Sequence, residues 1–173
     1  MEKLAALSLS IGLLAGVATF LAVGPASGVF FIWAATISWA AYFMLGANKE
    51  AVKNIIVCGI FGVVMAWITA ILLTGISPDA VLGFSLTAAI TVAVVVTVMC
   101  LLAVIPQLSV IPVSVLGYSA TFAYLLQTPG KLTPDVLLGV SLDNPLLVIS
   151  ISLVIGVYLG QFSAQLAAKW TKE

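Results

Sequence analysis

The sequence contains no histidine and no arginine, and its 173 residues carry six lysines and six acidic side chains. Charged residues make up 7% of the chain, whereas soluble domains contain roughly a quarter. No basic patch is therefore present to neutralise phosphates, and we expect no nucleic-acid partner. The chain also lacks a glycine-rich phosphate loop and a serine with a plausible base, so we expect no enzyme and no catalytic residue.

Cysteine is equally scarce. Cys58 and Cys100 both stand inside apolar runs, without a CxxC spacing and without a neighbouring histidine. A zinc or redox site needs such spacing and such ligands, so we expect no metal and no cofactor. Both cysteines are interpreted as packing residues.

Hydrophobic residues are abundant instead, at 63% of the chain. A helix needs about 20 apolar residues to cross the hydrocarbon core of a bilayer. The first apolar run exceeds the ~7 to 15 residues of the apolar h-region of a secretory signal, so it is interpreted as a membrane helix. We predict one domain over residues 1–173, an all-α polytopic bundle of six transmembrane helices at residues 4–23, 28–45, 55–74, 80–104, 108–126 and 145–168.

The boundary between the fourth and fifth spans is the weakest in this pattern. No charge occurs between Asp79 and Lys131, and only Pro106, Gln107 and Pro112 mark a break. An alternative with five spans and a re-entrant segment therefore stays open.

The lysines predict the orientation, because cytoplasmic loops collect Lys and Arg. With a cytoplasmic N-terminus, five of the six lysines fall inside and only Lys131 falls outside. All three aspartates, Asp79, Asp135 and Asp143, then fall outside as well. Both termini are therefore predicted to be cytoplasmic.

A short internal repeat occurs at two of the predicted outer loops. Residues 76–86 and 132–142 share Pro, Asp, Leu, Gly, Ser and Leu in register. One interpretation is a duplicated helix hairpin whose two copies have the same orientation, as in some transporters. The other is a coincidence of helix-start chemistry, since a hydroxyl followed by Pro and Asp favours a helix N-terminus.

The second predicted span is rich in aromatic residues. Trp33, Thr36, Trp39 and Phe43 recur at helical spacing along one side. They are candidates for an aromatic-walled solute pathway with a hydroxyl that forms hydrogen bonds. An interfacial belt formed by Trp39 and Tyr42, or plain helix packing, explains the same pattern.

The fifth span and the start of the sixth supply further pathway candidates. Tyr118, Thr121 and Phe122 combine hydroxyls with aromatic rings, and Asn144 precedes a proline where the last span begins. Close helix packing explains the first three equally, and simple capping explains Asn144.

Two pairs of glycines are spaced for close helix contact. Gly12 with Gly16, and Gly156 with Gly160, each form a small-xxx-small pattern. Such faces pack either within one chain or between chains. With two of them in so short a chain, we expect a homo-oligomer in the lipid bilayer.

None of the predicted spans contains a charge. Proton relays and ion-coupled transporters need intramembrane charges, so passive movement is the transport chemistry that fits. The sequence therefore predicts a channel or facilitator for a small uncharged or weakly polar solute. The alternative is a membrane scaffold or subunit of a larger complex, without transport.

The run from Phe31 to Phe43, together with residues 120–123, resembles the bacterial membrane proteins of domain-of-unknown-function family 1097. The similarity covers nearly the whole chain. It implies a multi-pass protein of the bacterial cytoplasmic (inner) membrane, and it transfers no site residue. A weaker similarity, the tripeptide 144–146, resembles an Asn-Pro-Leu element of urea-channel proteins, whose solute is neutral and planar.

Overall fold

The computed structural model describes residues 1–76 and 82–171, and the regular secondary structure of this part of the chain is all helical. Two 3-10 turns, η1 (Leu102–Val104) and η2 (Pro106–Leu108), separate the fourth helix from the fifth. The α-helices are α1 (Lys3–Val23), α2 (Ile32–Met44), α3 (Lys49–Thr74), α4 (Gly83–Leu101), α5 (Ile111–Gln127), α6 (Pro134–Leu138) and α7 (Pro145–Trp170).

Each predicted span overlaps one α-helix, although α2 begins four residues after the start of its predicted span and α3 begins six residues before the start of its own. Residues 80–81 lie outside the described part. Four segments are long and apolar enough to cross a membrane: α1, α3, α7, and α4 continued by η1. α2 has 13 residues and α5 has 17, which correspond to about 20 and 26 Å of helix against a hydrocarbon core of about 30 Å. The fold is thus consistent with a helical membrane bundle, with a clear break at Pro106 between α4 and α5.

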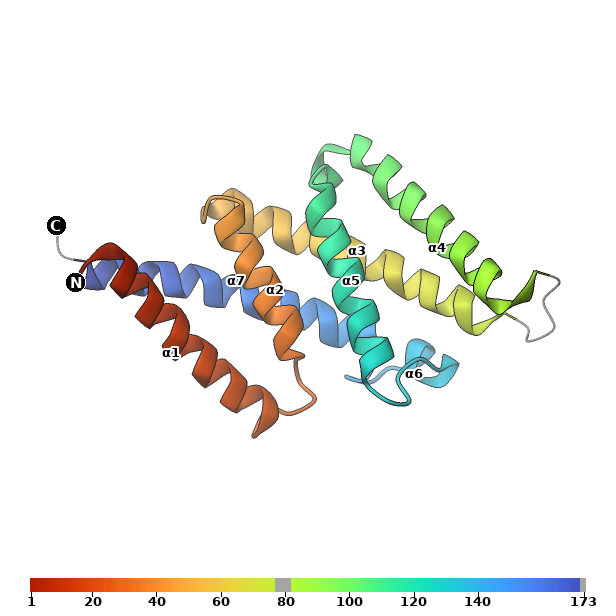
Figure 1. Cartoon of the computed structure of the whole chain (residues 1–173), viewed down its shortest axis with the longest axis horizontal. Coiled ribbons are helices and arrows are strands. Elements are labelled where there is room, and N and C mark those ends of the chain that lie inside the picture. Colours follow the sequence, from red (N-terminus) through yellow and green to blue (C-terminus); the bar gives the residue numbers. More distant parts are fainter. Residues whose placement is uncertain (77–81, 172–173) are drawn as a thin grey trace.

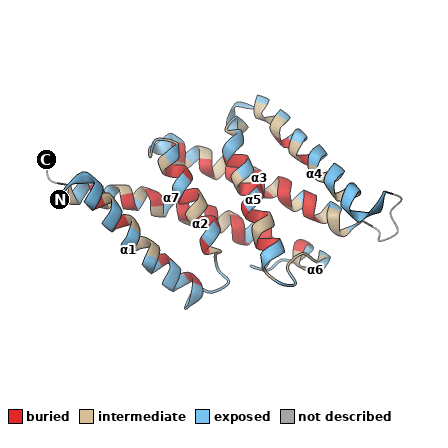
Figure 2. Ribbon diagram, in the orientation of Figure 1, coloured by how far each residue is buried: buried red, intermediate tan, exposed pale blue. Residues whose placement is uncertain are grey.

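The long helices α3 and α7 cross in antiparallel directions at the centre of the molecule (Figure 1). Leu153 of α7 meets Gly59 of α3 near the middle of both helices. Ile55, which precedes Gly59 in α3, belongs to the same buried cluster as Val157, which follows Leu153 in α7. Figure 2 shows that burial is concentrated in α2, α3, α5 and α7, while α1 and α4 are largely exposed.

α2 packs along α7 in a parallel direction. The backbone N–H of Phe31 donates to the Ser152 hydroxyl at 2.7 Å, and the Trp39 indole N–H donates to the Ser163 hydroxyl at 3.0 Å. Between these two bonds the helices approach so closely that a Cβ on Gly156 would collide with the Ala35 carbonyl. The absence of a side chain at this glycine therefore permits backbone contact.

α5 packs along α3 in the same manner. The Cys58 thiol donates to the Gln107 carbonyl at 3.3 Å, and the Tyr118 hydroxyl donates to the Thr69 hydroxyl at 3.1 Å. Between them, a Cβ on Gly62 would collide with the Ser114 carbonyl. The order of hydrogen bond, glycine contact and second hydrogen bond is the same as in the α2–α7 pair.

The chain therefore consists of two similar halves, α1–α2–α3 and α4–α5–α7. The outer helix of each half packs on the long helix of the other half, α1 on α7 and α4 on α3. Because each half contains three helices in alternating directions, the second half is inverted relative to the first. Identical residues stand at the same spacing in the two long helices: Ile55, Gly62, Val63 and Ala70 in α3, and Ile149, Gly156, Val157 and Ala164 in α7.

The short repeat predicted at residues 76–86 and 132–142 does not correspond to these halves. Residues 77–81, with Asp79, lie outside the described part of the chain. Gly83 to Leu86 begin the long helix α4, whereas the matching residues 139–142 form turns after the short helix α6. In the second copy the motif begins a helix, since Thr133 precedes α6 and Pro134 is its first residue. The larger structural repeat is inverted, not parallel.

Candidate functional site: a pocket beside Lys131

A pocket of about 330 Å³ lies where α1 ends and α2 begins, beside the last turn of α5 and the first turn of α7. A volume near 300 Å³ suits a small solute. We call it the Lys131 pocket; its lining residues are Ala22, Val23, Ser27, Gly28, Phe30, Phe31, Ile32, Trp33, Tyr124, Thr128, Lys131, Asp143 and Val148.

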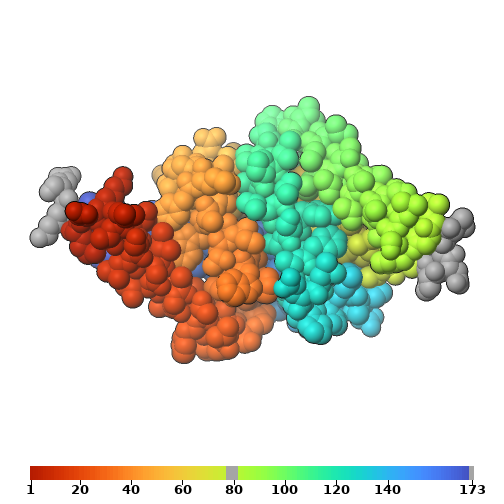
Figure 3. Space-filling model, in the orientation of Figure 1, coloured from red at the N-terminus to blue at the C-terminus, as the bar shows by residue number. Residues whose placement is uncertain are grey.

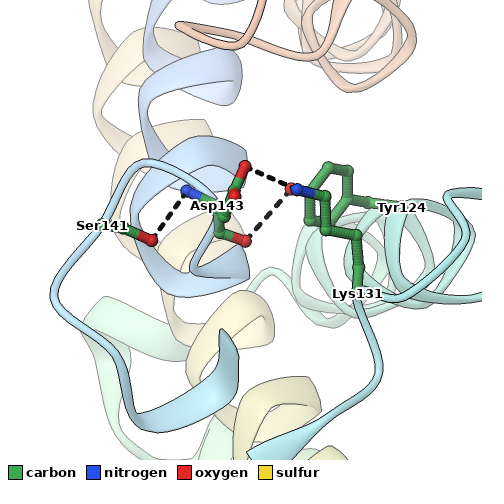
Figure 4. A network of polar contacts seen from close by, with 4 residues as sticks. All are labelled: Tyr124, Lys131, Ser141 and Asp143. Atoms are coloured by element: carbon green, nitrogen blue, oxygen red, sulfur yellow. Dashed lines mark hydrogen bonds and ion pairs between the residues drawn. The ribbon is translucent and has the colours of Figure 1, made fainter. Parts of the chain in front are cut away.

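An ion pair forms the polar wall of this pocket (Figure 4). The Lys131 ammonium lies 2.6 Å from the Asp143 carboxylate, and the Tyr124 hydroxyl donates to the Asp143 carbonyl oxygen at 3.0 Å. The Asp143 N–H donates in turn to the Ser141 hydroxyl at 3.3 Å. These contacts connect the end of α5, the following loop and the start of α7.

The charge of Lys131 persists at neutral pH. The hydrogen bond to the Asp143 carboxylate raises the pKa of the ammonium group, and partial burial opposes this more weakly. Its side chain is 21% exposed, so the ammonium is a partly desolvated donor in the wall of the pocket. Hydrogen bonds to such charged donors are stronger than those to neutral ones.

Aromatic side chains form the apolar wall. The rings of Phe31 and Tyr124 meet edge to face, with centroids 5.6 Å apart and an interplanar angle of 67°. This contact joins the first residues of α2 to the last turn of α5. An aromatic surface beside a charged donor and acceptor suits a small polar solute with a flat face.

A second pocket, of about 200 Å³, lies at the opposite end of the bundle. We call it the Lys53 pocket; it is lined by Glu50, Lys53, Asn54, Pro106, Gln107 and Ser109. Met1 and Trp170 lie at this end of α1 and α7, where the Met1 amino group donates to the Trp170 carbonyl at 3.0 Å. Buried apolar residues lie along the helices between the two pockets, among them Val63, Val113, Leu153 and Val157.

The pathway candidates of the second span lie in different places. Trp33 lines the Lys131 pocket and is 64% exposed, whereas Trp39 is 5% exposed and packs against α7. The Thr36 hydroxyl donates to the Trp33 carbonyl at 2.9 Å, and Phe43 packs with the buried Tyr42. The structure thus brings only Trp33 of these residues into the Lys131 pocket.

The candidates of the fifth span belong to the α3–α5 contact. Tyr118 bonds Thr69 and lies 5.1 Å from the Phe122 ring between centroids. The buried Thr121 hydroxyl donates to the Gly117 carbonyl one turn earlier at 2.9 Å. None of these three side chains lines the Lys131 pocket.

Asn144 caps α7, and its hydrogen bonds are made within the chain. Its side-chain oxygen accepts from the Leu146 N–H, and its amide nitrogen donates to the carbonyls of Leu137 and Gly139, all at 2.9 Å. The residue is 7% exposed. It therefore fixes α6 and the preceding loop on the start of α7, next to Asp143.

Replacing Asn144 with alanine is expected to lower the free energy of unfolding by about 2 to 3 kcal/mol, since one cap and two buried carbonyl partners are lost. Asn48→Ala is the matched control. Asn48 is an exposed cap that accepts from the Ala51 N–H at 2.8 Å, and its loss is expected to cost about 1 kcal/mol. Thermal unfolding in detergent measures both; equal losses would show that the contacts of Asn144 to the loop are weak.

The two glycine pairs have different surroundings. Gly156 and Gly160 both lie against α2, where added side chains would meet Ala35, Trp39 and Tyr42. A Cβ on Gly12 or Gly16 would meet nothing within 4 Å, and both residues are exposed on the outer face of α1. Gly156 and Gly160 therefore pack within the chain, while Gly12 and Gly16 leave an open face on α1.

Tyr124, Lys131 and Asp143 were not predicted as site residues. A signal for two of them was present, because Lys131 and Asp143 both fall in the loop between the fifth and sixth predicted spans, which carries both signs of charge. Among the residues described, no group of three His, Cys, Asp or Glu side chains is placed to hold a metal ion.

Residues 8–168 match the model of a protein family described as a protein of unknown function, DUF1097. The chain belongs to this family. The match confirms the resemblance of residues 31–43 and 120–123 and covers almost the entire chain. No curated protein and no solved structure matches it. Membership of DUF1097 assigns no activity, so the function has to be inferred from the site.

Proposed function

We propose that the six helices α1, α2, α3, α4, α5 and α7 all cross the cytoplasmic membrane of a bacterium and that the protein conducts a small uncharged or weakly polar solute passively. The observation that supports this proposal is the Lys131 pocket, in which an ion pair and an aromatic wall enclose about 330 Å³ at one end of the bundle. The short helices α2 and α5 span the bilayer where it thins locally around them.

The distribution of charge supports passive movement. The charged residues within the described helices lie within five residues of a helix end, such as Lys3 of α1, Lys53 of α3 and Lys169 of α7. The buried core of the described bundle contains hydroxyls, as at Thr69 and Thr121, but no carboxylate and no lysine. A proton-coupled cycle would need such a group.

The positions of the lysines support cytoplasmic termini. Lys3, near the C-terminal residues of α7, and Lys49 and Lys53, at the start of α3, lie at the same end as the chain termini. Lys131 lies at the opposite end. By the positive-inside rule the Lys131 pocket then opens to the outside and the Lys53 pocket to the cytoplasm.

We expect the variant Lys131→Met to lower the flux of small amides about tenfold or more, because a charge-assisted hydrogen bond contributes about 1.5 to 3 kcal/mol. Stopped-flow swelling of liposomes that carry the purified protein measures this flux with urea, small amides, glycerol and short carboxylic acids. Lys169→Met is the matched control, since it removes the same charge at the other end of the bundle and outside both pockets.

Two results would contradict the proposal. One is a permeability equal to that of empty liposomes for every solute tested. The other is an equal loss of flux in the Lys131 and Lys169 variants, which would indicate a general effect of charge and no solute contact in the pocket.

A membrane subunit without transport is the second candidate. The observation that favours it is the open face of α1, where Gly12 and Gly16 present backbone with no neighbour from the described chain. Close helix packing with another membrane helix suits such a face. Gly12→Leu tests this: a stable complex of the purified protein with another membrane protein should dissociate in the variant.

A further inference from the structure

The Lys131 and Lys53 pockets occupy equivalent places in the two inverted halves. Val148 of α7, which lines the first pocket, corresponds to Asn54 of α3, which lines the second, in the register set by Gly156 and Gly62. The residues preceding α2 line the first pocket, and those preceding α5 line the second. Two equivalent elements of the repeat, the start of the long helix and the segment before the short helix, therefore line a pocket at each end of the bundle.

The two pockets also share their chemistry. The first combines Lys131 with Asp143, and the second combines Lys53 with Glu50. A lysine and a carboxylate in each pocket select the same class of solute, one with both hydrogen-bond donors and acceptors, such as a small amide or a zwitterion. A solute approaching from either side would meet similar groups.

The path between the pockets is closed by packed side chains. Val63, Val113 and Val157 are buried at the level where α3 and α7 cross. At this level α2 makes its closest backbone contact with α7, where Ala35 meets Gly156. α5 makes its closest backbone contact with α3, where Ser114 meets Gly62. Figure 3 shows α2 and α5 side by side on one face, between α1 at one end and α4 at the other.

These glycine contacts lie near the middle of the bundle. At each end of the bundle a separate contact closes the pocket, made by the residue that precedes α2 or α5. At the Lys131 end, Phe31 contacts Tyr124. At the Lys53 end, Val110, the residue equivalent to Phe31, packs on the buried cluster that contains Ala41 and Tyr42. A tilt of α2 and α5 about the glycine contacts would open one closure while it compresses the other.

From this geometry we propose that the two pockets are the outer and inner mouths of one pathway and that they open alternately, so the protein is a carrier with a closed centre and not an open channel. The inference rests on the proposed transport function. It assigns the Lys53 pocket as a second solute-binding mouth, with Glu50, Lys53 and Asn54 as its polar groups.

Reaction of single cysteines with a membrane-impermeant thiol reagent tests the inference in full-length protein. Cys58→Ser with Cys100→Ala supplies the background; Ser152 already occupies the position equivalent to Cys58. Thr128→Cys reports on the Lys131 mouth and Ser109→Cys on the Lys53 mouth. In sealed vesicles of known orientation, the two cysteines should react from opposite sides.

The decisive measurement is the labelling rate of a cysteine at one mouth when a second substitution loosens the other mouth. Phe31→Ala loosens the Lys131 mouth and should slow the reaction of Ser109→Cys roughly fivefold. Val110→Ala loosens the other mouth and should slow the reaction of Thr128→Cys by a similar factor. Phe20→Ala, on the exposed face of α1, is the control and should change neither rate.

Unchanged rates at both distant mouths, or reaction of both cysteines from the same side, would overturn the inference. If one of the two loosening variants fails to fold, the other still decides, because each is read at a different mouth. The labelling requires no solute, so it separates the two proposals. Flux without reciprocal labelling would leave a channel with a fixed path, whereas reciprocal labelling without flux would remove the transport function.

Discussion

Replacing Gly62 with alanine is expected to lower the free energy of unfolding by about 3 kcal/mol, at the upper end of what overpacking costs. The added Cβ would collide with the carbonyl group of Ser114, and that backbone cannot turn aside as a flexible side chain does. α3 and α5 would have to separate, which also weakens the Tyr118–Thr69 hydrogen bond. By the equivalence of the two halves, Gly156→Ala should cost as much.

Gly12→Ala is the control for this experiment, because it has the same small-xxx-small spacing and nothing within 4 Å of the added Cβ. Its effect should stay within about 0.5 kcal/mol, as for other surface substitutions. Denaturant titration in detergent micelles compares the variants. Equal effects at Gly12 and Gly62 would show that the close helix crossing is not a source of stability.

The second large effect is expected for Trp39→Ala, which should lower the free energy of unfolding by about 3 to 5 kcal/mol. The indole is 5% exposed and donates to Ser163, so its removal leaves a cavity and breaks a hydrogen bond at the α2–α7 contact. Trp39→Phe keeps most of the volume and should cost about 1 kcal/mol, the contribution of one hydrogen bond.

Trp33→Ala is the natural comparison, since Trp33 belongs to the same helix and is 64% exposed. Its thermal unfolding should differ little from that of the unchanged protein. A loss of solute flux in Trp39→Ala alone would therefore report damage to the bundle and would say little about the pathway. A small loss of stability in Trp39→Ala would contradict the assignment of this residue to the packing between α2 and α7.

The sequence was a good guide to where the helices lie. α1 and α7 follow their predicted spans to within two residues, because long apolar runs bounded by charges have few other solutions in a bilayer. It was a poor guide to which face of each helix is buried. A membrane helix is apolar on all sides, so the pattern that normally reveals the buried face is weak, and Trp33 and Trp39 could not be told apart.

The structural repeat escaped prediction for a related reason. Its halves share little identity, since packing requires only that glycine, hydroxyl and small apolar residues recur at equivalent places, as Thr69 and Ser163 do. The short motif at residues 132–142 is visible in the sequence because it shares identical residues in register with residues 76–86. The pair Lys131 and Asp143 was visible in the sequence, but its closeness depends on how the loop folds back onto α7.

The interleaving of the two halves has a consequence for biogenesis. α1 and α2 both find their main packing partner in α7, which is synthesised after α3, α4, α5 and α6. Until the 26 residues of α7 enter the membrane, the first two helices lack this partner. A nascent chain interrupted within α7 should thus expose the hydroxyl and small-residue faces of α1 and α2 to quality-control proteases and membrane chaperones, which makes insertion of α7 the checkpoint for the packing of α1 and α2.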